Sequence, residues 1–371
     1  MLNDFIDRIQ AAHAHATPLV IRGGGSKAFY GNPCAGDSLD VTAWAGVVEY
    51  QPKELVLTAR AGTPLAELEM LLAQHGQMLA FEPPHFGGCP FPLAEAATHA
   101  APNPIHATLG GCVAAGLSGP RRPYAGAVRD SVLGVRMIDG TGQALRFGGQ
   151  VIKNVAGYDV SRLMTGSLGT LGLLTEVSLK VLPKPTAETT LQFESSEADA
   201  ILKMNQWAGQ PLSLSATSWH AGLLTVRLSG AASAVHAAQA KLGGETLAHA
   251  DEFWLRLRDH AAAFFDKRPS SPQLSLWRLA VKPSTLPLQL GDTQWIEWGG
   301  AVRWLISDLP AAALFAAAKS CGGHATLFCG KPLADGNLAP LSPALLTLHR
   351  NLKQRFDPQG IFNHGRLYPD F

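Results

Sequence analysis

The chain has 371 residues, of which 46% are hydrophobic and only 16% are charged, and its formal net charge is +1. This length indicates about two domains, and the high apolar content excludes an intrinsically disordered chain. The near-zero charge without a run of basic residues argues against nucleic-acid binding. The chain contains 38 Gly and 25 Pro residues, more than average, which predicts many tight turns or places where the backbone approaches a ligand.

The first residues, MLNDFIDRIQ, carry acidic side chains where a signal peptide carries basic ones. No apolar run approaches the ~18 residues of a membrane-spanning helix. We therefore expect a cytoplasmic protein with no direct membrane insertion. The five cysteines form no CxxC pair, so the spacing predicts no iron–sulfur cluster and no other metal site.

In the first half, short apolar runs alternate with glycine-rich loops. Residues 1–16 have the periodicity of an amphipathic helix, and a second helix is expected to begin at Thr63-Pro64. Strands are expected at residues 19–21, 55–59, 132–138 and 144–147, the last two as a hairpin. Pro183-Lys184-Pro185 interrupts the pattern and predicts a domain boundary.

The second half alternates strand and helix patterns, which favours an α+β layer, a sheet with helices on one face. Its strands are expected at residues 191–193, 213–218, 223–228, 274–281, 297–305 and 325–328. Its helices are expected at residues 197–208, 231–242, 251–265 and 310–320, and a tail helix at residues 345–356.

Three glycine-rich loops lie in the first half, at residues 22–27, 108–119 and 166–172. Glycine lets successive amides form a concave nest that suits a diphosphate, to which Arg22 and Lys27 could add charge. Each loop alone is better explained by a tight turn, and only the three together favour a ligand site. None has the spacing of GxGxxG or GxxxxGK[ST], so a Rossmann or P-loop site is excluded.

The loops together carry a resemblance. LVIRGGGSKAFYG (19–31), TLGG (108–111), GSLGTLG (166–172) and FDP…IFN (356–363) occur in this chain in that order. They resemble the FAD-binding (PCMH-type) domain shared by vanillyl-alcohol oxidase and p-cresol methylhydroxylase. The resemblance implies a two-lobed FAD-binding domain, with FAD extended between its lobes.

A narrower resemblance covers nearly the whole chain. The segments at 117–130, 151–163, 297–305 and 322–328 are similar to the FAD-binding E subunits of glycolate oxidases. That family implies oxidation of glycolate to glyoxylate beside a flavin-bearing D-type and an iron–sulfur F-type subunit, with any contact to the inner membrane made through partners. Two alternatives stay open: a stand-alone FAD-dependent 2-hydroxy acid dehydrogenase, and a non-catalytic assembly subunit with a structural flavin.

The resemblance also implies a division of the α+β chain into an FAD-binding domain (1–184), an α+β cap on the substrate side (185–339) and a C-terminal segment (340–371) that returns to the flavin domain. Ser26 stands where relatives with covalent flavin carry histidine, so we expect non-covalent FAD. The residues expected to bind FAD are Arg22, Gly23, Gly24, Gly25, Ser26, Lys27, Thr108, Gly110, Gly111, Ala114, Gly116, Ser118, Gly119, Gly126, Gly169, Thr170, Gly172, Leu173 and Asn363.

A 2-hydroxy acid oxidation needs a cation for the carboxylate and a base for the hydroxyl proton. Arg303 and His324, each following two glycines, are the candidates. The alternative for Arg303 is a salt bridge or a contact between subunits, and the alternative for His324 is a hydrogen-bonded structural histidine. Arg278, between apolar neighbours, is interpreted as a strand residue facing solvent. The flanking histidines of the related H-x-G-D-G-N-x-H metal motif are missing around Asp335-Gly336-Asn337, so the usual metal-assisted site is not expected.

Overall fold

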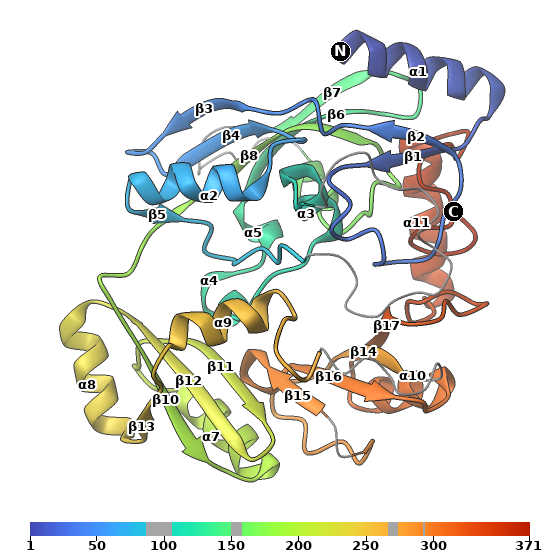
Figure 1. The fold of residues 1–371 in the computed structure, drawn as a ribbon. Coiled ribbons are helices and arrows are strands. Elements are labelled where there is room, and N and C mark those ends of the chain that lie inside the picture. The colour runs from blue at the N-terminus through green and yellow to red at the C-terminus, as the bar shows by residue number, and fades with distance from the viewer. Residues whose placement is uncertain (87–105, 150–157, 266–273, 292–293) are drawn as a thin grey trace.

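The computed structural model describes residues 1–86, 106–149, 158–265, 274–291 and 294–371. Most of the 151–163 segment quoted above therefore lies outside the described residues. Figure 1 shows two parts, one above the other: the N-terminal part with α11 at its side, and a second part built on a large sheet.

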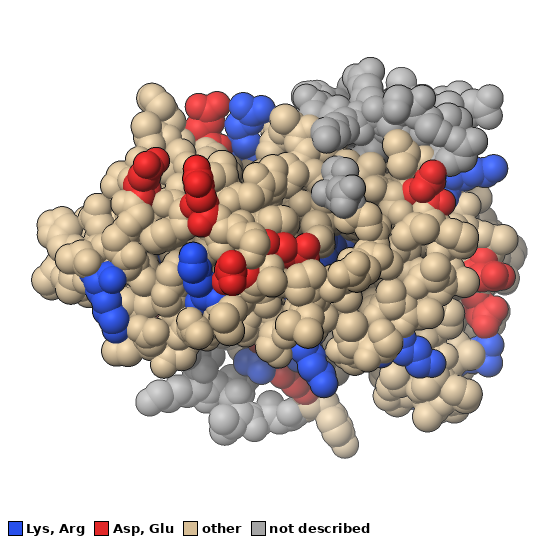
Figure 2. Space-filling view, turned by 90° about the horizontal axis from the view of Figure 1, so that it is seen from below, with Lys and Arg blue, Asp and Glu red and all other residues tan. Residues whose placement is uncertain are grey.

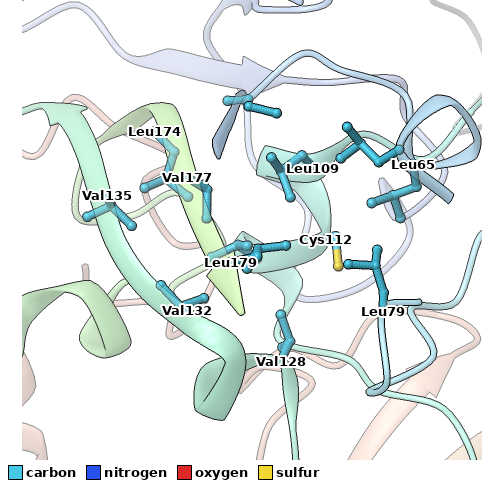
Figure 3. Packing of buried hydrophobic residues seen from close by; sticks show 14 of the residues in the cluster. Leu65, Leu79, Leu109, Cys112, Val128, Val132, Val135, Leu174, Val177 and Leu179 are labelled. Carbon is cyan, nitrogen blue, oxygen red and sulfur yellow. The ribbon is translucent and has the colours of Figure 1, made fainter. Parts of the chain in front are cut away.

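A five-stranded antiparallel sheet organises the N-terminal part, in the order β3-β4-β8-β6-β7. Its strands are β3 (Val47–Gln51), β4 (Val56–Arg60), β6 (Val132–Ile138), β7 (Ala144–Gly148) and β8 (Leu173–Lys180). The expected hairpin is confirmed, because β6 pairs with β7 in antiparallel register. Helices α2 (Leu65–Gln74) and α3 (Leu109–Ala115) pack their apolar side chains on this sheet, with Leu109, Val177 and Leu179 fully or almost fully buried between them (Figure 3).

A second apolar cluster fixes the first strand. β1 (Leu19–Arg22) pairs in parallel with β2 (Asp37–Asp40), and α1 (Leu2–His15) covers them with Phe5 and Ile9. The smaller elements are α4 (Arg122–Ala125), α5 (Val128–Ser131), α6 (Val160–Leu163), β5 (Gln77–Met78) and β9 (Leu182–Pro183).

The second part is an eight-stranded antiparallel sheet in the order β13-β10-β12-β11-β15-β16-β14-β17. Its strands are β10 (Ala187–Glu194), β11 (Leu214–His220), β12 (Leu223–Gly230), β13 (Glu245–Thr246), β14 (Ser275–Ala280), β15 (Gln294–Glu297), β16 (Val302–Ser307) and β17 (His324–Cys329). Its helices are α7 (Glu197–Ala208), α8 (Ala232–Leu242), α9 (Ala250–Arg258) and α10 (Ala311–Ser320).

Three of these helices cover one face of the sheet, as expected. Side chains of α7, α8 and α10 pack with the strands in two clusters. Helix α9 is the exception: its Trp254 and Leu257 join Trp295, Trp304 and Phe328 on the other face. Figure 1 places α9 between the sheet and the N-terminal part. The sequence analysis expected no helix on this second face, and it is this face that packs toward the N-terminal part.

The single continuous strand expected at residues 297–305 is wrong in its first part. Glu297 ends β15, a one-turn 3₁₀ helix at Trp298–Gly300 forms the turn to β16, and residues 302–305 lie in β16 as expected. Gly300 has a φ of +100°, and a Cβ there would lie 2.4 Å from the Pro283 carbonyl oxygen, so the chain can reverse direction only through glycine. The turn carries Trp298 to the N-terminal part, where its indole donates to the Gly119 carbonyl at 3.1 Å.

The C-terminal segment packs on the N-terminal part. Helix α11 (Pro343–Phe356) is followed by residues that lie beside β1, where Phe362 forms a parallel β-bridge with Leu19. The buried Lys353 ammonium holds this segment, donating to Asp357 at 2.7 Å and to the carbonyls of Thr170 and Phe362 at 2.8 Å.

Buried ion pairs join the two parts. The Arg121 side chain donates to Glu82 at 3.1 Å, to Ser229 at 2.8 Å and to Glu188 at 2.6 Å, while Arg227 pairs with Glu82 at 2.8 Å. The outer surface differs: in the view of Figure 2 acidic and basic side chains are interspersed over a mostly uncharged face. In the described ranges, no helix is long and apolar enough to span a bilayer.

Candidate functional site

The first two glycine loops lie side by side. The His106 amide donates to the Gly24 carbonyl at 3.0 Å, and Gly25 and His106 form an isolated parallel β-bridge. A Cβ on Gly24 would lie 2.1 Å from the His106 carbonyl oxygen, and one on Gly23 would lie 2.4 Å from Thr108 Oγ1. Only glycine permits this approach, since any side chain would push the two loops apart.

The third loop and the C-terminal segment close the arrangement into a ring. The Leu168 amide donates to the Ala114 carbonyl at 2.9 Å, which joins the third loop to the second. Asn363, in the C-terminal segment, joins the third loop to β1: its side-chain amide donates to the Leu168 carbonyl at 2.6 Å and accepts from the Ile21 amide at 2.8 Å. Segments far apart in the sequence thus converge on one region, as the resemblance implied.

The first loop offers unused donors within this ring. Among the described residues, the amides of Gly23, Gly24, Gly25 and Lys27 make no hydrogen bond. Successive unpaired amides at the end of a strand suit an anion. The loop therefore fits a diphosphate by its own chemistry.

The second loop offers fewer donors than expected. The Gly110 amide donates to the Ala61 carbonyl at 2.7 Å, and the Gly111 amide lies 3.4 Å from Thr108 Oγ1, which caps α3. Gly116 ends α3 in a left-handed conformation. These residues fix the helix beside the first loop rather than presenting a nest of their own.

Several other residues expected at the cofactor are engaged in packing. Thr170 is buried and its carbonyl accepts from Lys353, Leu173 lies in the core of β8, and Gly172 contacts Met137. Gly169 contacts the Asn363 side chain, whereas Gly126 ends α4 beside Asp130, outside the ring.

The three side chains of the first loop differ in placement. Arg22 is exposed, Ser26 is buried at 4% exposure, and Lys27 points inward. The Lys27 ammonium lies 5.5 Å from the centre of the Phe86 ring and donates to Ser26 Oγ at 3.2 Å. Burial lowers the pKa of Lys27, although the residue remains the one basic side chain of the loop that faces the interior.

A cleft begins where the second loop ends. Ser118 and Gly119 form one wall, and the face of the eight-stranded sheet that carries α9 forms the other. The cleft encloses about 360 Å³, including the part open to solvent. Its other lining residues are Pro84, Phe86, Leu117, Pro120, Leu257, Arg258, His260, Arg278, Glu297, Trp298, Trp304 and Phe328.

Arg278 and Glu297 are the unexpected members of this cleft. The Arg278 guanidinium lies 5.0 Å from the centre of the Trp298 ring and 5.9 Å from that of Trp304. Glu297 is 4% exposed and accepts a hydrogen bond from the Trp304 indole at 2.6 Å. Burial raises the Glu297 pKa to about 7, with the indole and Arg278 acting in the opposite direction. The interpretation of Arg278 as facing solvent is wrong.

A neutral histidine completes the aromatic wall. His260 stacks on Phe265 with ring centres 4.1 Å apart and meets Trp304 at 4.4 Å. Burial lowers the His260 pKa to about 3, so the ring is uncharged at neutral pH. It supplies shape to the cleft rather than charge.

The two residues expected to be catalytic lie outside this cleft. Arg303 is buried on the helix-covered face of the sheet, where it pairs with Glu197 at 3.3 Å and donates to the carbonyls of Gly300 and Thr285. This confirms the alternative of an internal salt bridge. His324 shares the cleft side of β17 with Phe328, since alternate strand residues share a face, but it is exposed at the end of the strand and is not among the lining residues.

Comparison with known proteins agrees with this geometry. Residues 2–89 match the FAD binding domain family. A solved alkyldihydroxyacetonephosphate synthase has the same fold, with a TM-score of 0.63 at 17% identity, over 96% of this chain and 73% of that one. The chain thus has the fold of the PCMH-type FAD-binding proteins.

The curated relatives narrow this class. Glycolate oxidase subunit GlcE of Escherichia coli (strain K12) is 46% identical over 365 residues, 98% of this chain and 97% of that protein. Glycolate oxidase subunit GlcD of Bacillus subtilis (strain 168) is 41% identical over 93 residues, 25% of this chain and 20% of that protein. The chain belongs to the GlcE family of glycolate oxidase subunits.

Proposed function

We propose that this chain is the FAD-binding subunit of a glycolate oxidase complex that oxidises glycolate to glyoxylate. Its identity to GlcE along nearly the whole length of both proteins carries the proposal. The ring of loops supports it, because the unpaired amides of the first loop lie where a dinucleotide's phosphates need donors. When bound, FAD accepts the hydride that leaves the substrate carbon.

The ring residues divide the binding work. The amides of Gly23, Gly24, Gly25 and Lys27 hold the diphosphate, and the Lys27 ammonium balances part of its charge. Thr108 and Asn363 keep the neighbouring segments in place through the hydrogen bonds described above. The cofactor is held without a covalent bond, since Ser26 has no ring nitrogen to attach to the flavin.

The proposal includes the division that the resemblance implies, into an FAD-binding domain at 1–184, a cap at 185–339 and a returning segment at 340–371. The ion pairs of Arg121 with Glu188 and of Arg227 with Glu82 support this division, because they fix the cap against the first domain. The hydrogen bonds of Lys353 hold the returning segment to the same domain. The cleft lies at the junction, next to the end of the second loop.

Electrons leave through partner subunits in this proposal. A 93-residue part of the chain is 41% identical to GlcD, which supports a D-type flavin subunit beside this one. An iron–sulfur F-type subunit would then carry single electrons onward, a task for which the cysteine spacing of this chain is unsuited.

Two measurements test the proposal. The absorption spectrum of the purified protein should show flavin, and acid precipitation should release the yellow colour into the supernatant; colour that stays in the pellet refutes non-covalent binding. Anaerobic glycolate should bleach the flavin when D- and F-type subunits are present. Full bleaching by the chain alone would identify a stand-alone dehydrogenase, and a colourless chain that still assembles would identify a structural subunit.

A further inference from the structure

The charge balance of the cleft is unusual. Within the described ranges, the Arg278 side chain makes no ion pair and no hydrogen bond; its guanidinium faces Trp298 and Trp304 and lies close enough to Glu297 to act on it electrostatically. The buried arginines elsewhere are paired: Arg121 and Arg227 with Glu82 and Glu188, and Arg303 with Glu197. The hydrogen-bond donors of Arg278 are thus unused on the wall of a cleft, where a guanidinium can bind an anion.

The strand geometry directs Arg278 into the cleft. Residues 276 and 278 of β14 share one face, and Leu276 lies in the cluster that also holds Trp304 and Phe328. Trp277 and Leu279 lie in the cluster of the opposite face with α10. The register pairs Arg278 with Trp304 on one side and Thr326 on the other, so β14 is an interior strand next to the edge strand β17, and Arg278 has a paired strand on both sides.

The surroundings select the anion. A guanidinium matches a carboxylate with two parallel hydrogen bonds. One oxygen of the neighbouring Glu297 carboxyl accepts a hydrogen bond from the Trp304 indole. The other oxygen can hydrogen-bond to a hydroxyl group of the ligand. Aromatic rings form much of the remaining wall. The cleft therefore suits a small molecule with one carboxylate and one hydroxyl group, whereas a second negative charge on the ligand would lie next to the Glu297 carboxyl.

We propose that this cleft is a binding site for a small 2-hydroxy monocarboxylate, with Arg278 holding the carboxylate and Glu297 contacting the hydroxyl. The inference rests on the proposed function only for the reaction that follows binding. It places substrate recognition in this subunit, through a group that needs no metal ion. Arg278 is thereby a specificity-determining residue, in place of the Arg303 that the sequence favoured.

Binding can be measured on the purified full-length protein, because two tryptophans flank the guanidinium. Titration with glycolate under anaerobic conditions should change the tryptophan fluorescence in a saturable way, and glycolamide, which lacks the carboxylate, should not. Arg278→Gln should weaken glycolate binding about 10- to 100-fold, the range of a lost hydrogen-bonded charge pair. Equal affinity for glycolate and glycolamide would overturn the proposal.

Arg122 supplies a matched control. Its guanidinium stacks on Trp298 from 4.5 Å but is not among the residues that line the cleft. Since Arg122 is close enough to act electrostatically on Arg278, Arg122→Gln should lower the glycolate affinity far less than Arg278→Gln does, and a loss as large as that of Arg278→Gln would refute the assignment. If Arg278→Gln does not fold, Arg278→Lys and the comparison of glycolate with glycolamide on the unmodified protein decide.

The outcomes separate the two proposals. A yellow protein that binds no glycolate refutes the cleft assignment and leaves the FAD-binding role intact. A protein that binds glycolate but no FAD refutes the proposed function and leaves the cleft assignment intact. FAD content of Arg278→Gln should equal that of the unmodified protein, because Arg278 does not contact the first loop in the described structure.

Discussion

Replacement of Glu297 by Gln should remove a pH dependence from the stability of the protein. In the folded chain burial raises the Glu297 pKa to about 7, from 4.5, so the folded protein keeps a proton that the unfolded chain releases. The contribution of Glu297 to the free energy of unfolding is therefore fully present below pH 4.5 and is lost as the pH rises through 7. A tenfold change in proton affinity corresponds to about 1.4 kcal/mol, so the stability lost above pH 8 is about 3 kcal/mol.

Glutamine keeps the oxygen that accepts from the Trp304 indole, and it does not ionise. The groups facing position 297 are this indole and the charges of Arg278 and Glu82, with Arg258 and His260 also lining the cleft. They remain in both proteins, so their own titration largely cancels in the difference.

Urea unfolding at pH 5 and pH 8.5 provides the assay. The variant should gain about 2–3 kcal/mol relative to the unmodified protein between these pH values. A difference that stays constant across this range would refute the reasoning, because it would mean that the Glu297 carboxyl titrates alike in the folded and unfolded chains.

Three further variants follow from the packing. Lys353→Met should destabilise the protein by about 3–5 kcal/mol in urea unfolding, since it strips a buried ion pair of its cation; a loss below about 1 kcal/mol would contradict the role of Lys353 in holding the C-terminal segment. Gly24→Ala should lower the FAD content of the purified protein, because the new methyl group would collide with the His106 carbonyl, whereas Gly209→Ala, where a methyl group would make only ordinary van der Waals contacts, should keep full FAD content. Arg303→Gln should lower the melting temperature and leave the glycolate affinity within about twofold; a large loss of affinity would restore Arg303 as a substrate ligand.

Much of the fold could be predicted from the sequence, because apolar periodicity identifies strands and helices directly. The hairpin of β6 and β7 and the alternation of strands and helices after residue 185 are examples. The turn at Trp298–Gly300 was missed because aromatic and apolar residues on both sides of two glycines give the same pattern as one continuous strand. What decides between the two is the close approach of the Pro283 carbonyl, which is remote in the sequence.

The site was predictable only in part, for a related reason. Periodicity shows that Arg278 and Arg303 alternate with apolar neighbours. It does not show which face of the sheet each side chain lies on, or what packs against that face. The fate of Arg303 was set by Glu197 at the start of α7, more than one hundred residues away. Likewise, glycine spacing located the loops, whereas the engagement of the Gly110 amide by the Ala61 carbonyl depends on a tertiary contact.

The ring that surrounds the first loop has a consequence for biogenesis. The ribosome makes Asn363 and the Lys353 anchor more than three hundred residues after Gly23 and its neighbours. The ring therefore stays open at one side until residues 353–363 have been made, and a shorter nascent chain has the first loop but lacks the contacts that close the ring around it.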